Sequence, residues 1–168
     1  MDAFRNEDFS HDAARQGAID TLHREGCSCV ILCGGREYLF RQRGVRDLHD
    51  LLRGRPELLR GSFVADKVVG KAAAALMILG GVGSVYAGTL SEPARALFAA
   101  SGLRVGCGRL VPHVINRAGT GWCPLESRCH ALKTPEECLA SIEAFLATLP
   151  EAPAAGDMPR GADNGMKQ

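Results

Sequence analysis

Two polar segments hold the residues whose types and spacing could carry out chemistry. In the first, Asp66, Lys67, Gly70 and Lys71 precede an alanine-rich apolar run. A carboxylate there can accept hydrogen bonds or act as a base, and lysines at a helix N-terminus attract an anionic or carbonyl-bearing ligand. Gly70, without a side chain, permits close approach of a ligand or strand. The segment therefore predicts a small-molecule site. Asp66 and Lys71 are its candidate catalytic residues, and Lys67 and Gly70 are candidate ligand-binding residues.

The second segment is a polar loop that runs from Asn116 to Glu126. Pro124 suits the first position of a helix and Glu126 the third, which places the Cys123 sulfur near backbone N–H groups that favour a thiolate. Cys123 is thus the candidate nucleophile or ligand contact. Asn116, Arg117 and Glu126 are candidate ligand-binding residues.

Each candidate also has a purely structural interpretation, which the residues alone leave open. Asp66 can be an ordinary helix N-cap, with Lys67 and Lys71 as an exposed lysine face. Cys123 can be packed as a small hydrophobe. The loop can hydrogen-bond to itself through Asn116.

The hydrophobic pattern predicts the elements that position these residues. We expect helices over 10–24, 66–79, 91–101 and 134–149, strands over 27–33, 37–41, 82–90, 104–112 and 113–116, and short helical pieces over 48–59. In this order the elements predict an α/β protein, a three-layer α/β/α sandwich around a mixed central sheet. Ser91 is the expected N-cap of the third helix.

Length and composition limit the classes of protein. The 168 residues fit one domain, expected over 15–149, after a flexible N-terminus (1–14) and before a disordered, Pro- and Gly-rich tail (150–168). The net charge of +1 gives no field that attracts nucleic acid. No run approaches the roughly 20 apolar residues of a membrane span. We therefore expect a cytoplasmic protein with no nucleic-acid and no membrane partner.

Seven cysteines, an odd number, predict reduced thiols in such a compartment. Cys29 and Cys33 on one strand would stand about 13 Å apart at roughly 3.3 Å per residue, too far to share a metal ion. Cys123, Cys129 and His130 have irregular spacing for zinc. We predict no metal site and name no cofactor.

Three ordered segments carry a family resemblance: Ala65-Asp-Lys-Val-Val-Gly-Lys-Ala-Ala-Ala, Tyr86-Ala-Gly-Thr-Leu-Ser-Glu and Ile115-Asn-Arg-Ala-Gly-Thr-Gly-Trp-Cys-Pro-Leu-Glu. Over residues 15–148 the chain resembles an uncharacterised bacterial family of unknown function whose fold is similar to that of the cytidine deaminases. The resemblance implies that the N-termini of two central helices converge. The first segment and Ser91 would then share one cleft with the 116–126 loop.

Zinc deaminases carry His-x-Glu at the helix after the first hairpin and Pro-Cys-x-x-Cys at the helix after the third strand. We expect Asp66-Lys67-Val68 and Ser91-Glu92-Pro93-Ala94 at these two positions, so the zinc ligands and the catalytic glutamate are absent. A zinc-bound hydroxide has no source in this pattern.

We therefore predict a protein with a deaminase-like fold that binds a small polar or anionic metabolite, nucleotide-like ligands included, without catalytic zinc. One alternative is a non-catalytic structural or regulatory interaction module, with a homo-oligomer as one form of assembly. A second is a divergent metal-dependent hydrolase or deaminase that uses Cys123, Cys129 and a histidine. The sequence does not decide whether the protein is an enzyme.

Overall fold

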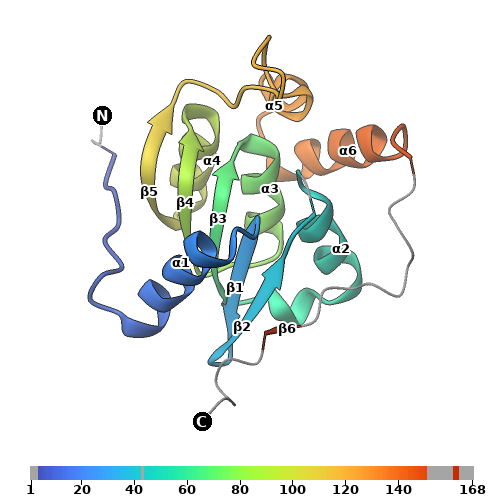
Figure 1. Cartoon of the computed structure of the whole chain (residues 1–168). Helices are drawn as coiled ribbons and strands as arrows, with labels where there is room; N and C mark the ends of the chain where they lie inside the picture. Colours follow the sequence, from blue (N-terminus) through green and yellow to red (C-terminus); the bar gives the residue numbers. More distant parts are fainter. Residues whose placement is uncertain (1–3, 43, 151–160, 163–168) are drawn as a thin grey trace.

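The computed structural model describes residues 4–42, 44–150 and 161–162. A mixed sheet in the order β5-β4-β3-β1-β2-β6 forms its centre (Figure 1). The strands are β1 (Cys29–Cys33), β2 (Arg36–Phe40), β3 (Phe63–Val69), β4 (Ser84–Ser91), β5 (Arg104–Val111) and β6 (Gly161–Ala162). The helices are α1 (Ala13–Glu25), α2 (Arg46–Gly54), α3 (Lys71–Leu79), α4 (Glu92–Ser101), α5 (Pro124–Cys129) and α6 (Pro135–Leu146), with a 3₁₀ turn at Pro56–Leu58.

Strands β3, β4 and β5 are parallel, and β1 pairs antiparallel with both β2 and β3. The parallel strands need crossovers, which α3 and α4 supply. Their carboxyl ends therefore meet at one edge of the sheet. At this edge α3 and α4 begin, and the 112–123 segment and α5 lie over it (Figure 1).

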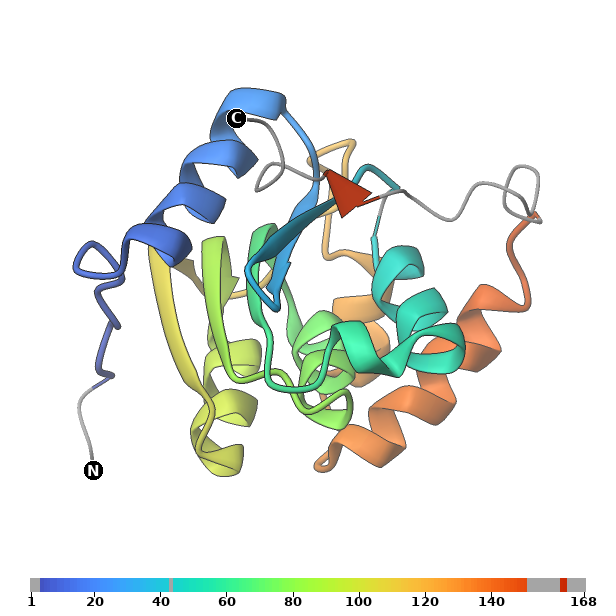
Figure 2. The same cartoon turned by 90° about the horizontal axis from the view of Figure 1, so that it is seen from below.

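Helices cover both faces of the sheet, as expected for an α/β protein. Helix α1 lies on one face, and α2, α3, α4 and α6 lie on the other (Figure 2). Alternate strand residues enter two cores: Ile31 and Val64 join the larger core under α3, whereas Val30 and Ala65 join the smaller core under α1. The period of two along β1 and β3 thus follows from burial on both faces.

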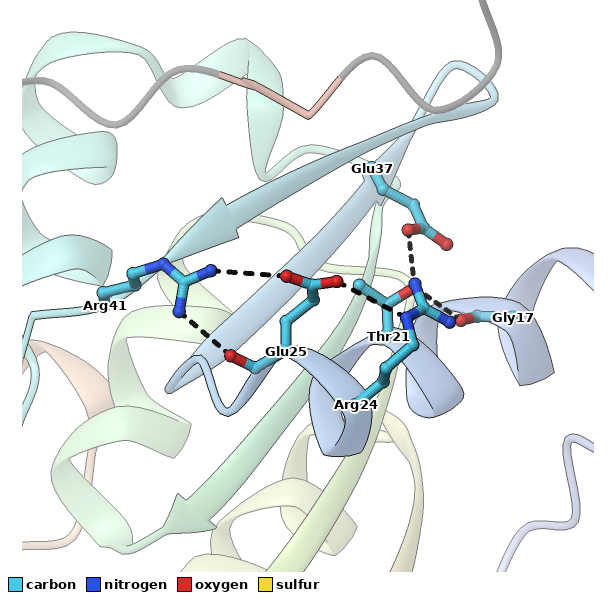
Figure 3. A network of polar contacts seen from close by, with 6 residues as sticks. All are labelled: Gly17, Thr21, Arg24, Glu25, Glu37 and Arg41. Carbon is cyan, nitrogen blue, oxygen red and sulfur yellow. Dashed lines mark hydrogen bonds and ion pairs between the residues drawn. The ribbon is translucent and has the colours of Figure 1, made fainter. Parts of the chain in front are cut away.

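A polar network fixes α1 against the first hairpin (Figure 3). The Thr21 hydroxyl lies 2.9 Å from the Gly17 carbonyl oxygen and 2.8 Å from Glu37 Oε1 on β2. At the helix end, Arg41 donates to the Glu25 carbonyl oxygen at 3.1 Å and forms an ion pair with its carboxylate at 3.7 Å. Helix and hairpin are therefore joined at two points by side chains.

Several predicted boundaries are confirmed. Gly34 and Gly35, with φ of 59° and 80°, turn the first hairpin. The Ser91 hydroxyl accepts from Ala94 N at 3.2 Å and caps α4. Thr134, where the helix over 134–149 is predicted to start, is the N-cap of α6 and forms a capping box with Glu137.

The helix predicted over 66–79 forms as α3 and ends at Leu79 as predicted, but its predicted start at Asp66 is wrong. Parallel pairing with β4 keeps the backbone extended to Val69, and Gly70 is the N-cap of α3. Asp66 is consequently a strand residue and caps nothing, and Lys67 and Lys71 do not share a helix face. The strand predicted over 113–116 is also wrong, because only an isolated bridge between Ile115 and Trp122 forms there.

The flexibility predicted for 1–14 stays a prediction. The predicted tail over 150–168 lies outside the described residues, apart from Pro150 and the backbone of β6. Among the described residues, no helix is both long and apolar enough to cross a membrane.

The larger core should dominate stability. Leu76 on α3 is fully buried, so Leu76→Ala should reduce the free energy of unfolding by about 2–5 kcal/mol. The matched control is Leu149→Ala, whose side chain is 36% exposed and whose loss should change stability by less than about 0.5 kcal/mol. Urea unfolding measures both, and equal effects would contradict this assignment of the core.

Candidate functional site

The Glu126 carboxylate sits at the N-terminus of α3. It is 2% exposed, and its two oxygens accept from Lys71 N and Val114 N, each at 2.8 Å. Lys71 is the first residue of α3, so its N–H has no acceptor within the helix and a negative charge there is favourable. Glu126 therefore occupies the position that the sequence assigned to an anionic ligand.

The Lys71 side chain points back to the segment that carries Glu126. Its ammonium donates to the His130 carbonyl oxygen at 3.1 Å and to that of Leu132. A Cβ on Gly70 would lie 3.2 Å from Glu126 Oε1, so glycine lets the carboxylate approach. We call these reciprocal contacts of Lys71 and Glu126 the α3–α5 clamp.

Asp66 differs from Glu126 and Lys71 in the contacts that its side chain makes. It is 8% exposed, and in the sheet it lies between Cys29 of β1 and Ala87 of β4. Within the described residues its carboxyl receives hydrogen bonds only from the backbone N–H groups of Lys67 and Val68, the latter at 3.2 Å. Burial, with a smaller contribution from the charge of Asp47, raises the pKa of Asp66 to about 7. The fold thus does little to stabilise the charged form of the Asp66 carboxyl.

Asp47 near the start of α2 is buried but well satisfied. It accepts from Gln42 N at 2.9 Å and from Gln42 Nε2 at 2.6 Å, while burial raises its pKa. Burial, followed by the charges of Asp66 and Asp47, also raises the pKa of the Cys29 thiol. Cys29, Asp47 and Asp66 therefore form a buried acidic group built from three elements, of which Asp66 is the least compensated.

The remaining predicted residues have separate positions. Asn116 organises its own turn, since its carbonyl oxygen accepts from Gly119 N and its Oδ1 from Thr120 N, each at 3.0 Å. This is the self-bonded loop that the sequence left open. Lys67 and Arg117 are exposed, and Ser91, already the cap of α4, is fully buried. The contacts bring Gly70, Lys71 and Glu126 together but do not join them to Asp66.

Cys123 is the N-cap of α5 and is partly buried. Beside it, the exposed Trp122 ring stacks on His113, with centroids 4.0 Å apart, and meets His130 edge-on at 4.9 Å. The sequence analysis considered His130 only as a metal ligand and did not connect it with His113 through Trp122. The two histidines that contact Trp122 are 17 residues apart, and contacts of this kind leave no periodic pattern in the sequence.

No metal centre is found within the described part of the chain, where no three His, Cys, Asp or Glu residues are placed to hold an ion. Cys129 is fully buried, and its thiol interacts with that of Cys138, which together with burial raises the pKa of Cys129. Cys129 therefore contacts Cys138 rather than forming a metal site with Cys123 and His130.

Comparison with known proteins identifies the family. A model described as TM1506, Domain of unknown function (DUF1893), matches residues 17–146. The chain belongs to this family. The crystal structure of a DUF1893 family protein (TM1506) from Thermotoga maritima shares the fold, with a TM-score of 0.74, 22% sequence identity and coverage of 86% of this chain and 96% of that chain. The comparison with curated proteins gives no match.

The predicted membership of a family of unknown function is thus confirmed. At 22% identity the solved DUF1893 structure supports the fold alone. The similarity to cytidine deaminases stays a prediction.

Removing the clamp carboxylate should be costly. Glu126→Ala leaves the buried N–H of Lys71 and the part-buried N–H of Val114 without an acceptor, so the free energy of unfolding should fall by about 3 kcal/mol. Glu136→Ala on the exposed surface of α6 is the control and should cost less than about 0.5 kcal/mol. Denaturant unfolding followed by fluorescence of the single tryptophan, Trp122, measures both. Equal stabilities of the two variants would contradict the clamp.

Asp66 should make stability depend on pH. Its pKa is about 7 in the folded chain against an ordinary aspartate value of 3.8, so folding disfavours the charged form, and stability should fall as pH rises from about 4 to about 7. The loss amounts to about 4 kcal/mol at 1.36 kcal/mol per pKa unit. Asp66→Asn should lack this loss, whereas the exposed control Asp20→Asn should keep it. Urea unfolding at pH 4 to 8 with identical profiles for Asp66→Asn and wild type would refute the assignment.

Proposed function

We propose that this protein binds a small polar molecule bearing N–H donors through Asp66, on a scaffold similar to that of the cytidine deaminases and without catalytic zinc. The observation that carries the proposal is the buried Asp66 carboxyl, whose only hydrogen-bond donors among the described residues are backbone groups next to it in sequence.

The three buried carboxyls of the domain support this choice by contrast. Glu126 and Asp47 each accept two short hydrogen bonds from outside their own turn. A buried carboxyl without such donors is costly, and a ligand that supplies N–H groups would remove that cost. Near pH 7 both protonation states of Asp66 are populated, so the group can accept a hydrogen bond or exchange a proton with the ligand.

The contacts of Glu126 and Lys71 narrow the chemical class of the ligand. An anion at the start of α3 would have to displace Glu126, and the Lys71 ammonium is already bound to two carbonyl oxygens. We therefore favour neutral or cationic ligands at Asp66 over anionic ones. An aminopyrimidine edge, as in a nucleobase, presents the N–H donors that a carboxylate accepts.

The element order also relocates the positions that the deaminase resemblance implies. The helix after the first hairpin is α2, and the helix after the third strand is α3. The motif positions therefore fall at Arg46-Asp47-Leu48-His49 and at Gly70-Lys71-Ala72-Ala73, not at Asp66-Lys67-Val68 and Ser91-Glu92-Pro93-Ala94. Neither start contains His-x-Glu or Pro-Cys-x-x-Cys. The lack of zinc ligands persists, and Asp47 and Asp66 flank the region where the resemblance implies a site.

A non-catalytic interaction module is the second candidate. Ile115 and Trp122, which form the isolated bridge, are 49% and 36% exposed. Exposed apolar side chains that adjoin one another are typical of contact surfaces. The loop would then serve a partner, and Asp66 would have no ligand.

Paired probes test the first proposal. A native mass spectrum of the purified protein reports a retained ligand, and calorimetric titration with cytosine and uracil compares two rings that differ in an amino donor. We expect cytosine to bind more tightly than uracil, and Asp66→Asn to weaken cytosine binding at least tenfold, while Asp20→Asn leaves it unchanged. Cys123→Ser in the same assay tests whether the predicted nucleophile contacts the ligand. Cytosine binding that Asp66→Asn leaves intact, or no binding of either ring to wild type, would overturn the proposal.

A further inference from the structure

The outer edge of β5 is partly covered by the chain's own N-terminal segment, residues 6–9, which we call the strap. Glu7 N donates to the Val105 carbonyl oxygen at 3.1 Å. The Asn6 side chain accepts from Cys107 N at 2.7 Å and donates to the Cys107 carbonyl oxygen at 3.1 Å. The segment runs beside β5 in the opposite direction (Figure 1). The strap thus takes the place of a neighbouring strand.

The strap is fitted closely at one point and held weakly at another. A Cβ on Gly106 would lie 2.2 Å from the Glu7 carbonyl oxygen, so only glycine permits this approach. Phe9 is buried and meets Phe63 edge-on at 4.9 Å. Asn6, in contrast, is exposed. Phe9 anchors the strap, while its first residues can exchange their hydrogen bonds for others.

The strap leaves the C-terminal part of the outer β5 edge uncovered. Gly108, Arg109 and Leu110 are exposed, Leu110 to 37%, and no other described segment pairs with the outer edge of β5. An exposed strand edge with an apolar side chain is a template for another strand. The part of the edge that the strap covers and the part that it leaves uncovered both belong to one continuous strand, β5.

We propose that the outer edge of β5 is an interaction surface for a second copy of this chain, and that the strap competes with that copy for the edge. Two β5 strands can pair antiparallel about a two-fold axis at Cys107, whose main-chain N–H and C=O point to the outer edge. This register sets Arg109 opposite Val105, and Arg104 opposite Leu110. Like charges do not face each other, and main-chain hydrogen bonds join the copies.

Release of the strap tests the proposal. Asn6→Ala removes two hydrogen bonds, and Gly106→Ala displaces the Glu7 carbonyl oxygen. In sedimentation velocity, the double variant should dimerise at least tenfold more tightly than wild type. Adding Leu110→Lys should reverse this gain, whereas the control Leu149→Lys, at another exposed leucine, should not.

Two results would overturn the proposal. One is a double variant that stays monomeric while hydrogen exchange shows that the Cys107 amide has become unprotected. The other is a dimer that Leu110→Lys leaves intact. If the double variant fails to fold, Asn6→Ala alone, at an exposed residue, gives the same comparison.

Discussion

The carboxylate of Glu126 at the N-terminus of α3 is the interaction on which the carboxyl edge of the sheet depends. Glu126 and Lys71 are 55 residues apart, yet the backbone of Lys71 binds the Glu126 side chain and the Lys71 ammonium binds the carbonyl oxygens that follow α5. A helix of six residues has little stability alone, so α5 is held by these contacts and by packing. The clamp explains why a lysine and a glutamate can both be buried here.

This internal pairing changes the chemistry available at the edge. A helix N-terminus flanked by lysine would ordinarily favour an anion, but Glu126 already supplies the negative charge. The buried carboxyl that the fold compensates least, Asp66, is on β3 instead. Asp66 retains an ability to bind or exchange protons that the packing of the domain does not use. The proposed site at Asp66 and the structural role of Lys71 therefore follow from the same arrangement.

Local signals in the sequence were sufficient for much of the fold. Turn glycines fixed the hairpin at Gly34, and cap residues fixed the starts of α4 at Ser91 and α6 at Thr134. The start of α3 was misplaced because an aspartate before an apolar run is typical of an N-cap. Pairing of β3 with β4, a contact between distant residues, decided that Asp66 is in a strand. Local preference cannot report that pairing.

The candidate site was less predictable for the same reason. The residue types of Asp66, Lys71 and Glu126 drew attention to them in the sequence, but their roles depend on the contacts that each one makes. The contacts of Glu126 with Lys71 and Val114 span 55 and 12 residues and have no periodic signature. The Asn116 loop was easier, because its hydrogen bonds reach at most five residues along the chain.

The most direct test of this account is the titration of the Asp66 side-chain carboxyl carbon by NMR, assigned by comparison with Asp66→Asn. The account predicts a midpoint near pH 7, because burial outweighs the two backbone donors, Val68 N and Lys67 N, and raises the pKa of this group to about 7. A midpoint near the ordinary aspartate value of about 4 would show that the carboxyl is solvated or paired, and would contradict the account.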